Sequence, residues 1–135
     1  MTLGSLRNEV RIRAGADAVW ARVNDAGRLH EWFPGMTACT LDGNIRVVSL
    51  ASGVVFPEEI LVRDPVARRF QYRITAPVFR HHCGTIVVTD FGDGTCGVSY
   101  ATEADPRTMA LAIAAGTRRA LAELKRQMEA PGEDD

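Results

Sequence analysis

The chain has 135 residues, of which 46% are hydrophobic and 24% are charged, and this length and composition are typical of a single globular domain. Its 16 basic and 17 acidic residues give a net charge of -1, which offers no electrostatic basis for binding nucleic acid or an anionic membrane surface. No apolar run reaches the roughly 18 residues of a membrane span, and three scattered cysteines are typical of free thiols in a reducing compartment, so we expect a cytoplasmic protein.

The first quarter of the chain predicts one strand and two short helices. After a tail over 1–4, neutral and charged side chains alternate over 5–13, which indicates a half-buried strand. A short helix is expected over 15–25, with Gly15 as its N-cap. The stretch RLHEWFPGM at 28–36 joins two aromatics to a proline and a glycine. Its proline limits it to about one helical turn.

The middle of the chain predicts six strands. From 36 to 104 the spacing of apolar residues changes to period 2. The segments DGN (42–44) and GDGT (92–95) separate pairs of such runs. They indicate tight hairpins, because glycine, aspartate and asparagine tolerate the positive φ of these turns. The sequence therefore predicts a long antiparallel sheet whose strands are connected in order.

A long helix is predicted over 105–129, with Asp105 as its N-cap and Pro106 in its first helical position. An acidic tail over 130–135 follows it. Small side chains on one face of the helix indicate either close packing on the sheet or a gap left for a ligand. That face carries Met109, Ile113, Gly116, Ala120, Leu124 and Met128.

This order of elements resembles the START-related helix-grip superfamily (SRPBCC), which includes polyketide cyclase/dehydrase-like and lipid-transport proteins. The residues that carry the resemblance are ADAVWARVNDAGRLHEWFPGM (16–36), IRVVSLASG (45–53), EEILVRDP (58–65), FQYRIT (70–75) and the C-terminal helix. The resemblance implies an α+β helix-grip fold in a single domain over 5–129. In this fold a curved antiparallel sheet of about seven strands wraps round a long C-terminal helix, with two short helices after the first strand.

The resemblance also implies an apolar cavity between the sheet and the long helix, with the segment after the first helix at its mouth. Trp32 and Phe33 would then form its wall or lid, which suits aromatic side chains because they cover much area and lose few rotamers. The alternative is that Trp32 plugs the end of the sheet as part of the core.

Strand parity places three ionisable side chains on the inner face of the sheet. If Ile86 and Val88 point inward, so does His82, and the same alternation places Arg46 and Glu58 inside. An unpaired buried charge is expensive, so we expect Arg46 and Glu58 to pair or to share water. The predicted ligand-binding residues are Trp32, Phe33, Arg46, Val48, Glu58, Ile60, Tyr72, Ile74, His82, Tyr100, Met109, Ile113, Gly116 and Thr117.

Two kinds of function fit these residues. The first is a binder or carrier of a small hydrophobic molecule, such as a lipid, a polyketide or an aromatic metabolite. The second is a polyketide cyclase/dehydratase-type enzyme, in which Arg46 or Tyr72 would polarise a carbonyl and His82 or Glu58 would move a proton. A protein-interaction module with a vestigial cavity is a weaker third reading. No catalytic signature separates these readings, and we favour binding, with His82 titrating near its ordinary pKa of roughly 6.5.

We expect neither a cofactor nor a metal. His81 and His82 are adjacent in a predicted strand, so their side chains point to opposite faces and cannot readily share one ion. The expected partner is a small hydrophobic ligand, without nucleic acid and without a membrane span. The chain is either a monomer or a homodimer, and the sequence leaves that choice open.

Overall fold

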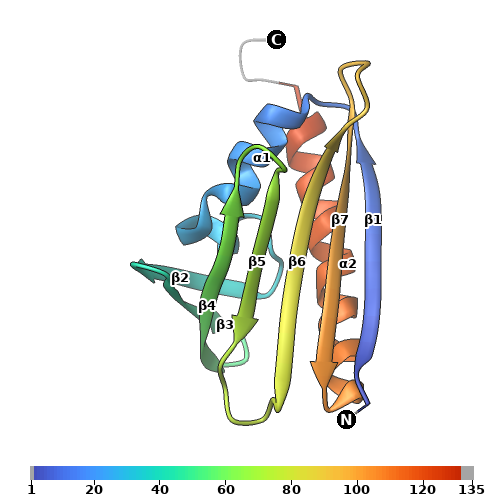
Figure 1. Cartoon of the computed structure of the whole chain (residues 1–135). Helices are drawn as coiled ribbons and strands as arrows, with labels where there is room; N and C mark the ends of the chain where they lie inside the picture. Colours follow the sequence, from blue (N-terminus) through green and yellow to red (C-terminus); the bar gives the residue numbers. More distant parts are fainter. Residues whose placement is uncertain (1, 132–135) are drawn as a thin grey trace.

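A computed structural model describes residues 2–131 of the chain (Figure 1). The predicted acidic tail therefore lies largely outside the described residues. The elements are, in order, β1 (Gly4–Ile12), α1 (Ala16–Asn24), the 3-10 helix η1 (Ala26–Glu31), β2 (Met36–Asp42), β3 (Ile45–Leu50), β4 (Val55–Asp64), β5 (Arg69–Ile74), β6 (His81–Asp90), β7 (Cys96–Asp105) and α2 (Arg107–Glu129).

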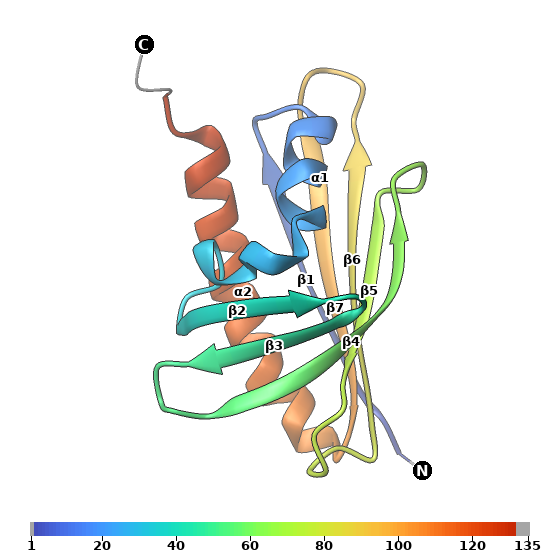
Figure 2. The same cartoon turned by 90° about the vertical axis from the view of Figure 1, so that its left-hand side faces the viewer.

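The seven strands form one antiparallel sheet in the order β1-β7-β6-β5-β4-β3-β2. Figure 2 shows that β2 and β3 run across the direction of β6 and β7, so the sheet is strongly curved, with α2 along its concave side. This arrangement confirms the predicted α+β helix-grip fold, with two short helical segments between β1 and β2.

The alternation of side chains within strands decides which of them enter the core. Along β1 partly buried and exposed residues alternate until Ile12, which is fully buried. The hairpin between β2 and β3 turns at Gly43, whose φ of +61° is one that residues with a Cβ rarely adopt. The core itself lies between the concave face of the sheet and the helices α1, η1 and α2.

Helix α2 begins at Arg107, so the expected cap is wrong. Pro106 is the N-cap and has an extended conformation, with φ −68° and ψ 143°. Asp105 cannot cap the helix because it is the last residue of β7, paired with His81, and its carbonyl accepts a hydrogen bond from the backbone N–H of Arg80 at 2.8 Å.

The buried face of α2 is also rotated from the predicted stripe. Its buried residues are Ala110, Thr117, Ala120, Leu121 and Leu124, whereas four of the six predicted positions are only partly buried. The reason is that α2 packs against β1 and β7, not against the whole sheet. Gly4 of β1 permits this contact, because a Cβ atom there would lie 2.8 Å from the Cβ of Ala110.

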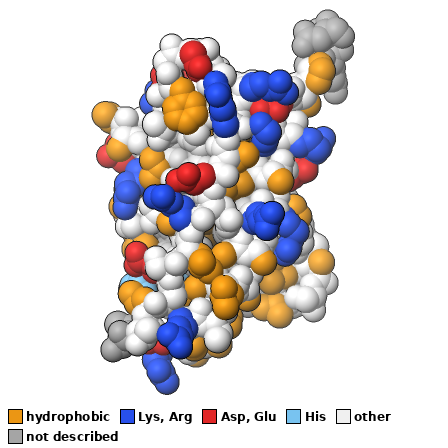
Figure 3. Space-filling view, turned by 90° about the vertical axis from the view of Figure 1, so that its right-hand side faces the viewer, with side chains coloured by type: hydrophobic (Ala, Val, Ile, Leu, Met, Phe, Trp, Pro, Cys, Tyr) orange, Lys and Arg blue, Asp and Glu red, His pale blue; other side chains and the backbone are white. Residues whose placement is uncertain are grey.

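The first half of α2 differs in character from its second half. Residues 109–116 include no charged side chain. On the face of the molecule that includes β1, hydrophobic side chains gather in the lower half of the view (Figure 3). Within residues 2–131, neither helix is long and apolar enough to cross a lipid bilayer.

Candidate ligand-binding site

Three neighbouring strands bring four polar side chains together on the concave face of the sheet. Gly84 of β6 lies opposite Tyr72 of β5 on one side and opposite Thr102 of β7 on the other. His82 lies two residues before Gly84 on β6, and Tyr100 lies two residues before Thr102 on β7. Both side chains therefore point to the same face as those residues. All four side chains belong to residues that are at most 3% exposed. We call Tyr72, His82, Tyr100 and Thr102 the polar cluster.

Gly84 makes room for this cluster. A Cβ atom at Gly84 would lie 2.6 Å from the ring of Tyr72, so that ring occupies the space that a side chain would need. The hydroxyls of Tyr72 and Tyr100 are hydrogen-bonded at 2.5 Å, and the rings of Tyr72 and His82 have their centroids 5.5 Å apart. Burial raises the pKa of both tyrosines, so both hydroxyls keep their protons at neutral pH.

Arg46 and Glu58 form a buried ion pair, as predicted. They lie opposite each other on β3 and β4, and Nε and Nη2 of Arg46 are 2.8 and 2.7 Å from Oε1 of Glu58. Nη1 donates to the carbonyl of Ala26 at 3.3 Å, and the guanidinium lies over the rings of Phe70 and Tyr72. Burial raises the pKa of Glu58, and the charge of Arg46 opposes that shift. The pair therefore joins two strands to η1.

His82 is fixed by the backbone of the neighbouring strand. The pairing of β5 with β6 ends at Tyr72 and Gly84, and beyond that point Nδ1 of His82 accepts a hydrogen bond from the backbone N–H of Ile74 at 2.8 Å. Burial, followed by the charge of His81, lowers the pKa of His82 to about 4. The expectation of an ordinary pKa is therefore wrong, because the imidazole is desolvated.

We expect an acid titration to show this shift directly. In the unfolded chain a histidine has a pKa of roughly 6.5, whereas His82 in the folded chain titrates at about 4. Between these values the unfolded chain binds more protons, so the free energy of unfolding should fall as the pH falls from about 6.5 to about 4. NMR of the imidazole protons measures the midpoint, and His82→Phe should lack this part of the pH dependence. A midpoint near 6.5 would contradict the burial.

Phe33 fills the space beside the glycine of α2. A Cβ atom at Gly116 would lie 3.4 Å from the ring of Phe33, and that ring meets Tyr100 edge-on at a centroid distance of 6.4 Å. The small residue on α2 therefore faces an aromatic ring and not the backbone of a strand. Trp32 is 2% exposed and belongs to the hydrophobic core, as in the plug alternative that the sequence left open.

The other predicted ligand-binding residues divide by burial. Thr117 is buried, and its hydroxyl is already paired, since it accepts from Nδ2 of Asn8 at 3.0 Å and donates to the carbonyl of Ala114 at 3.1 Å. Ile113 is partly buried against the core, and Met109 is also partly buried. The buried apolar positions are Val48, Ile60 and Ile74.

Comparison with known proteins places the chain in a family. Residues 4–129 match the family described as polyketide cyclase / dehydrase and lipid transport. The chain belongs to this family. No curated protein matches it. The family and the fold support a START- and polyketide-cyclase-like domain, which confirms the superfamily that the sequence predicts.

Solved structures with the same fold include three of different origin. The protein XoxI from Bacillus cereus has a TM-score of 0.85 at 17% identity, covering 93% of this chain and 95% of that one. A START superfamily protein from Mycobacterium smegmatis has a TM-score of 0.76 at 15% identity, covering 93% and 97%. Norcoclaurine synthase from Thalictrum flavum, solved with dopamine and hydroxybenzaldehyde, has a TM-score of 0.74 at 18% identity, covering 98% and 90%. At these identities the likeness establishes the fold alone.

Two residues at or beside the polar cluster, Thr102 and Phe79, were not among the predicted site residues. Thr102 is 1% exposed, and its Oγ1 has no hydrogen-bond partner among residues 2–131. The parity that placed Tyr100 inside also places Thr102 inside, so the signal was present in the sequence. Phe79 packs edge-on against the ring of His82, with centroids 5.3 Å apart. It lies between β5 and β6, where no periodicity indicates the direction of a side chain.

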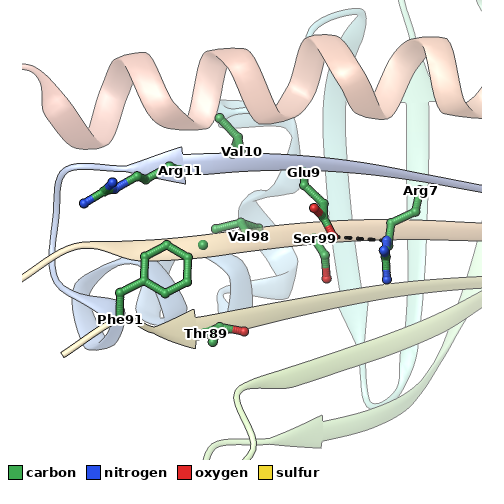
Figure 4. Close-up of a pocket in the computed structure, with 9 residues that line it drawn as sticks. Arg7, Glu9, Val10, Arg11, Thr89, Phe91, Val98 and Ser99 are labelled. Carbon is green, nitrogen blue, oxygen red and sulfur yellow. Dashed lines mark ion pairs between the residues drawn. The ribbon is translucent and has the colours of Figure 1, made fainter. Parts of the chain in front are cut away.

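Two surface hollows lie away from the polar cluster. One, of about 590 Å³, is on the outer face of β1 and β7 and extends to Thr89 and Phe91 at the end of β6 (Figure 4). The other, of about 200 Å³, adjoins the turn at Gly43. Neither is the internal cavity that we expect between α2 and the sheet, and that cavity stays a prediction.

Proposed function

We propose that this domain binds a small hydrophobic molecule, such as a lipid, a polyketide or an aromatic metabolite, between α2 and the concave face of the sheet. The observation that carries the proposal is a pair of buried polar atoms, Nε2 of His82 and Oγ1 of Thr102, that have no partner in the described part of the chain. Buried polar atoms in folded proteins are almost always paired. A ligand's polar group would remove the cost of leaving these two unpaired.

We place the entrance at Phe33. Its ring is only partly buried, and it lies between Tyr100 of the polar cluster and Gly116 of α2. Because Gly116 has no side chain, a rotation of Phe33 would leave a gap about as wide as an aromatic ring. Such a gap would lead from the surface to the polar cluster.

A cyclase/dehydratase activity is the alternative, and the contacts favour it less. It needs a group that accepts a proton from the substrate. The carboxylate of Glu58 is already engaged by Arg46, and Nδ1 of His82 already accepts the hydrogen bond from Ile74. Turnover of a carbonyl compound that is lost in Glu58→Gln while binding persists would support the enzyme.

The binding proposal is tested with the purified chain. We expect native mass spectrometry of freshly purified protein to detect a bound apolar compound, and a fluorescent apolar dye to bind in a one-to-one ratio. Gly116→Leu should weaken dye binding by about tenfold, roughly 1.4 kcal/mol, because its side chain would occupy the gap that a rotation of Phe33 opens.

The matched control is Ala115→Leu, which adds the same side chain at an exposed position of α2 and should leave dye affinity unchanged. Binding that is insensitive to Gly116→Leu but lost in Phe91→Ser would place the dye in the outer hollow and would contradict the proposal.

A further inference from the structure

The neutral imidazole of His82 has its proton on the nitrogen that lacks a hydrogen-bond partner among the described residues. Nδ1 accepts the hydrogen bond from Ile74, so it carries a lone pair and no proton. A neutral imidazole has one N–H, and that N–H is therefore at Nε2. Nε2 is buried and has no partner in the described part of the chain. His82 thus offers a hydrogen-bond donor and has no free lone pair.

The rest of the polar cluster also has donors to spare. The hydroxyl of Thr102 has no hydrogen-bond partner among the described residues. Between Tyr72 and Tyr100 only one of the two phenolic hydrogens can lie in the single hydrogen bond that joins them. The other hydroxyl hydrogen has no acceptor within residues 2–131. Three donors on this face therefore lack an acceptor among the described residues: Nε2–H of His82, the hydroxyl of Thr102 and one of the two tyrosine hydroxyls.

These donors lie around one small residue. Thr102 and Tyr72 are the two cross-strand neighbours of Gly84, and His82 is two residues from Gly84 on the same face. Directly opposite residues have Cβ atoms about 4.5–5.5 Å apart, and diagonal neighbours about 7–8 Å. One ligand oxygen above this part of the sheet is thus within reach of more than one donor.

Among residues 2–131, the buried positive charge beside the donors is already paired. His82 is neutral because burial lowers its pKa, and the tyrosines remain protonated. The buried cation Arg46 adjoins the cluster, since its guanidinium lies over the ring of Tyr72, but its charge is already paired with Glu58. A carboxylate placed here would lose its hydration without gaining a cation, which is costly.

We infer that the ligand carries a neutral acceptor oxygen, of the kind found in a ketone, quinone or ester, which accepts hydrogen bonds from Nε2–H of His82 and from the hydroxyl of Thr102. This inference rests on the proposed binding function. It assigns His82 a role as donor, not as base. A hydrocarbon without oxygen would leave these donors unpaired, and a carboxylate would be desolvated.

Three matched probes test the ligand class: methyl naphthyl ketone, ethylnaphthalene and naphthoate. The first two differ by one carbonyl in place of a methylene, and the third carries a charge. By isothermal titration calorimetry we expect the ketone to bind about tenfold tighter than ethylnaphthalene, because the net contribution of one hydrogen bond corresponds to about that difference in affinity. We expect naphthoate to bind no better than ethylnaphthalene.

Substitutions at the two donors should remove this preference. Thr102→Val keeps the shape and deletes the hydroxyl, so it should lower ketone affinity about tenfold and leave ethylnaphthalene binding unchanged. His82→Phe should also reduce the preference for the ketone, and it removes the acceptor of the Ile74 N–H as well. The control is Thr85→Val on the outer face of β6, where the hydroxyl accepts from Gln71, and it should preserve the preference for the ketone.

The outcomes separate this inference from the binding proposal. Equal affinity for ketone and ethylnaphthalene overturns the inference and leaves binding intact. The inference is also overturned if the apolar dye binds but none of the three probes does. Failure of dye and probes together overturns both. Proton–nitrogen NMR of the free protein needs no ligand: a proton on Nδ1 of His82 instead of Nε2 at neutral pH would overturn the donor assignment.

Discussion

Glu58→Leu will destabilise the protein by about 3–5 kcal/mol, because it leaves the guanidinium of Arg46 buried without its counter-ion. Combining it with Arg46→Met removes both charges and should restore most of the loss, since apolar residues of similar size can replace a buried pair at little cost. Urea denaturation of the wild type, both single variants and the double variant measures the free energies of unfolding and the coupling between the two sites.

An exposed pair on the same molecule is the control. Arg126 and Glu123 lie one turn apart on α2, with 67% and 28% of their side chains exposed. The same cycle on this pair should give a coupling of about 0.2–1 kcal/mol. Additive losses at Arg46 and Glu58 would mean that the two charges are hydrated in solution, contrary to their burial.

The adjacent aromatics Trp32 and Phe33 should respond differently to alanine. Trp32 is 2% exposed within the core, so Trp32→Ala should cost about 3–5 kcal/mol of stability. Phe33 is only partly buried, so Phe33→Ala should cost less and should instead change the affinity for an apolar dye. Urea denaturation and dye titration of both variants test the contrast.

Val66→Ala provides a baseline for this comparison, because Val66 is 90% exposed and its truncation should change stability by no more than about 0.5 kcal/mol. Equal losses of stability in Trp32→Ala and Phe33→Ala would show that both rings belong to the core. Phe33 would then not be a movable element at the mouth of the site.

Strand parity is the part of the site that the sequence predicts best. The period-2 pattern of β3, β4 and β6 is sufficient to place Arg46, Glu58 and His82 inside, because successive side chains of a strand point to opposite faces of the sheet. The pairing of Arg46 with Glu58 follows from the cost of an isolated buried charge, before any distance is known. The order of the elements carries the family resemblance that implies the helix-grip fold.

Other features depend on contacts between distant segments. The buried face of α2 is set by the strands on which it rests, and the close approach at Gly4 turns Ala110 inward in place of Met109. The protonation state of His82 depends on where the β5–β6 pairing ends. Neither fact is contained in the periodicity of a single segment.

The bond between Ile74 and His82 also makes the end of the β5–β6 pairing responsive to acid. Nδ1 can accept the backbone N–H only while it lacks a proton; once protonated it becomes a second donor facing the first. The acid titration of His82 should therefore also release the amide of Ile74, with hydrogen exchange at that amide accelerating relative to Tyr72 as the ring becomes charged. Where β5 and β6 separate, the backbone is held by a hydrogen bond to a side chain, and the strength of that bond depends on pH. Hydrogen bonds between peptide groups have no such dependence.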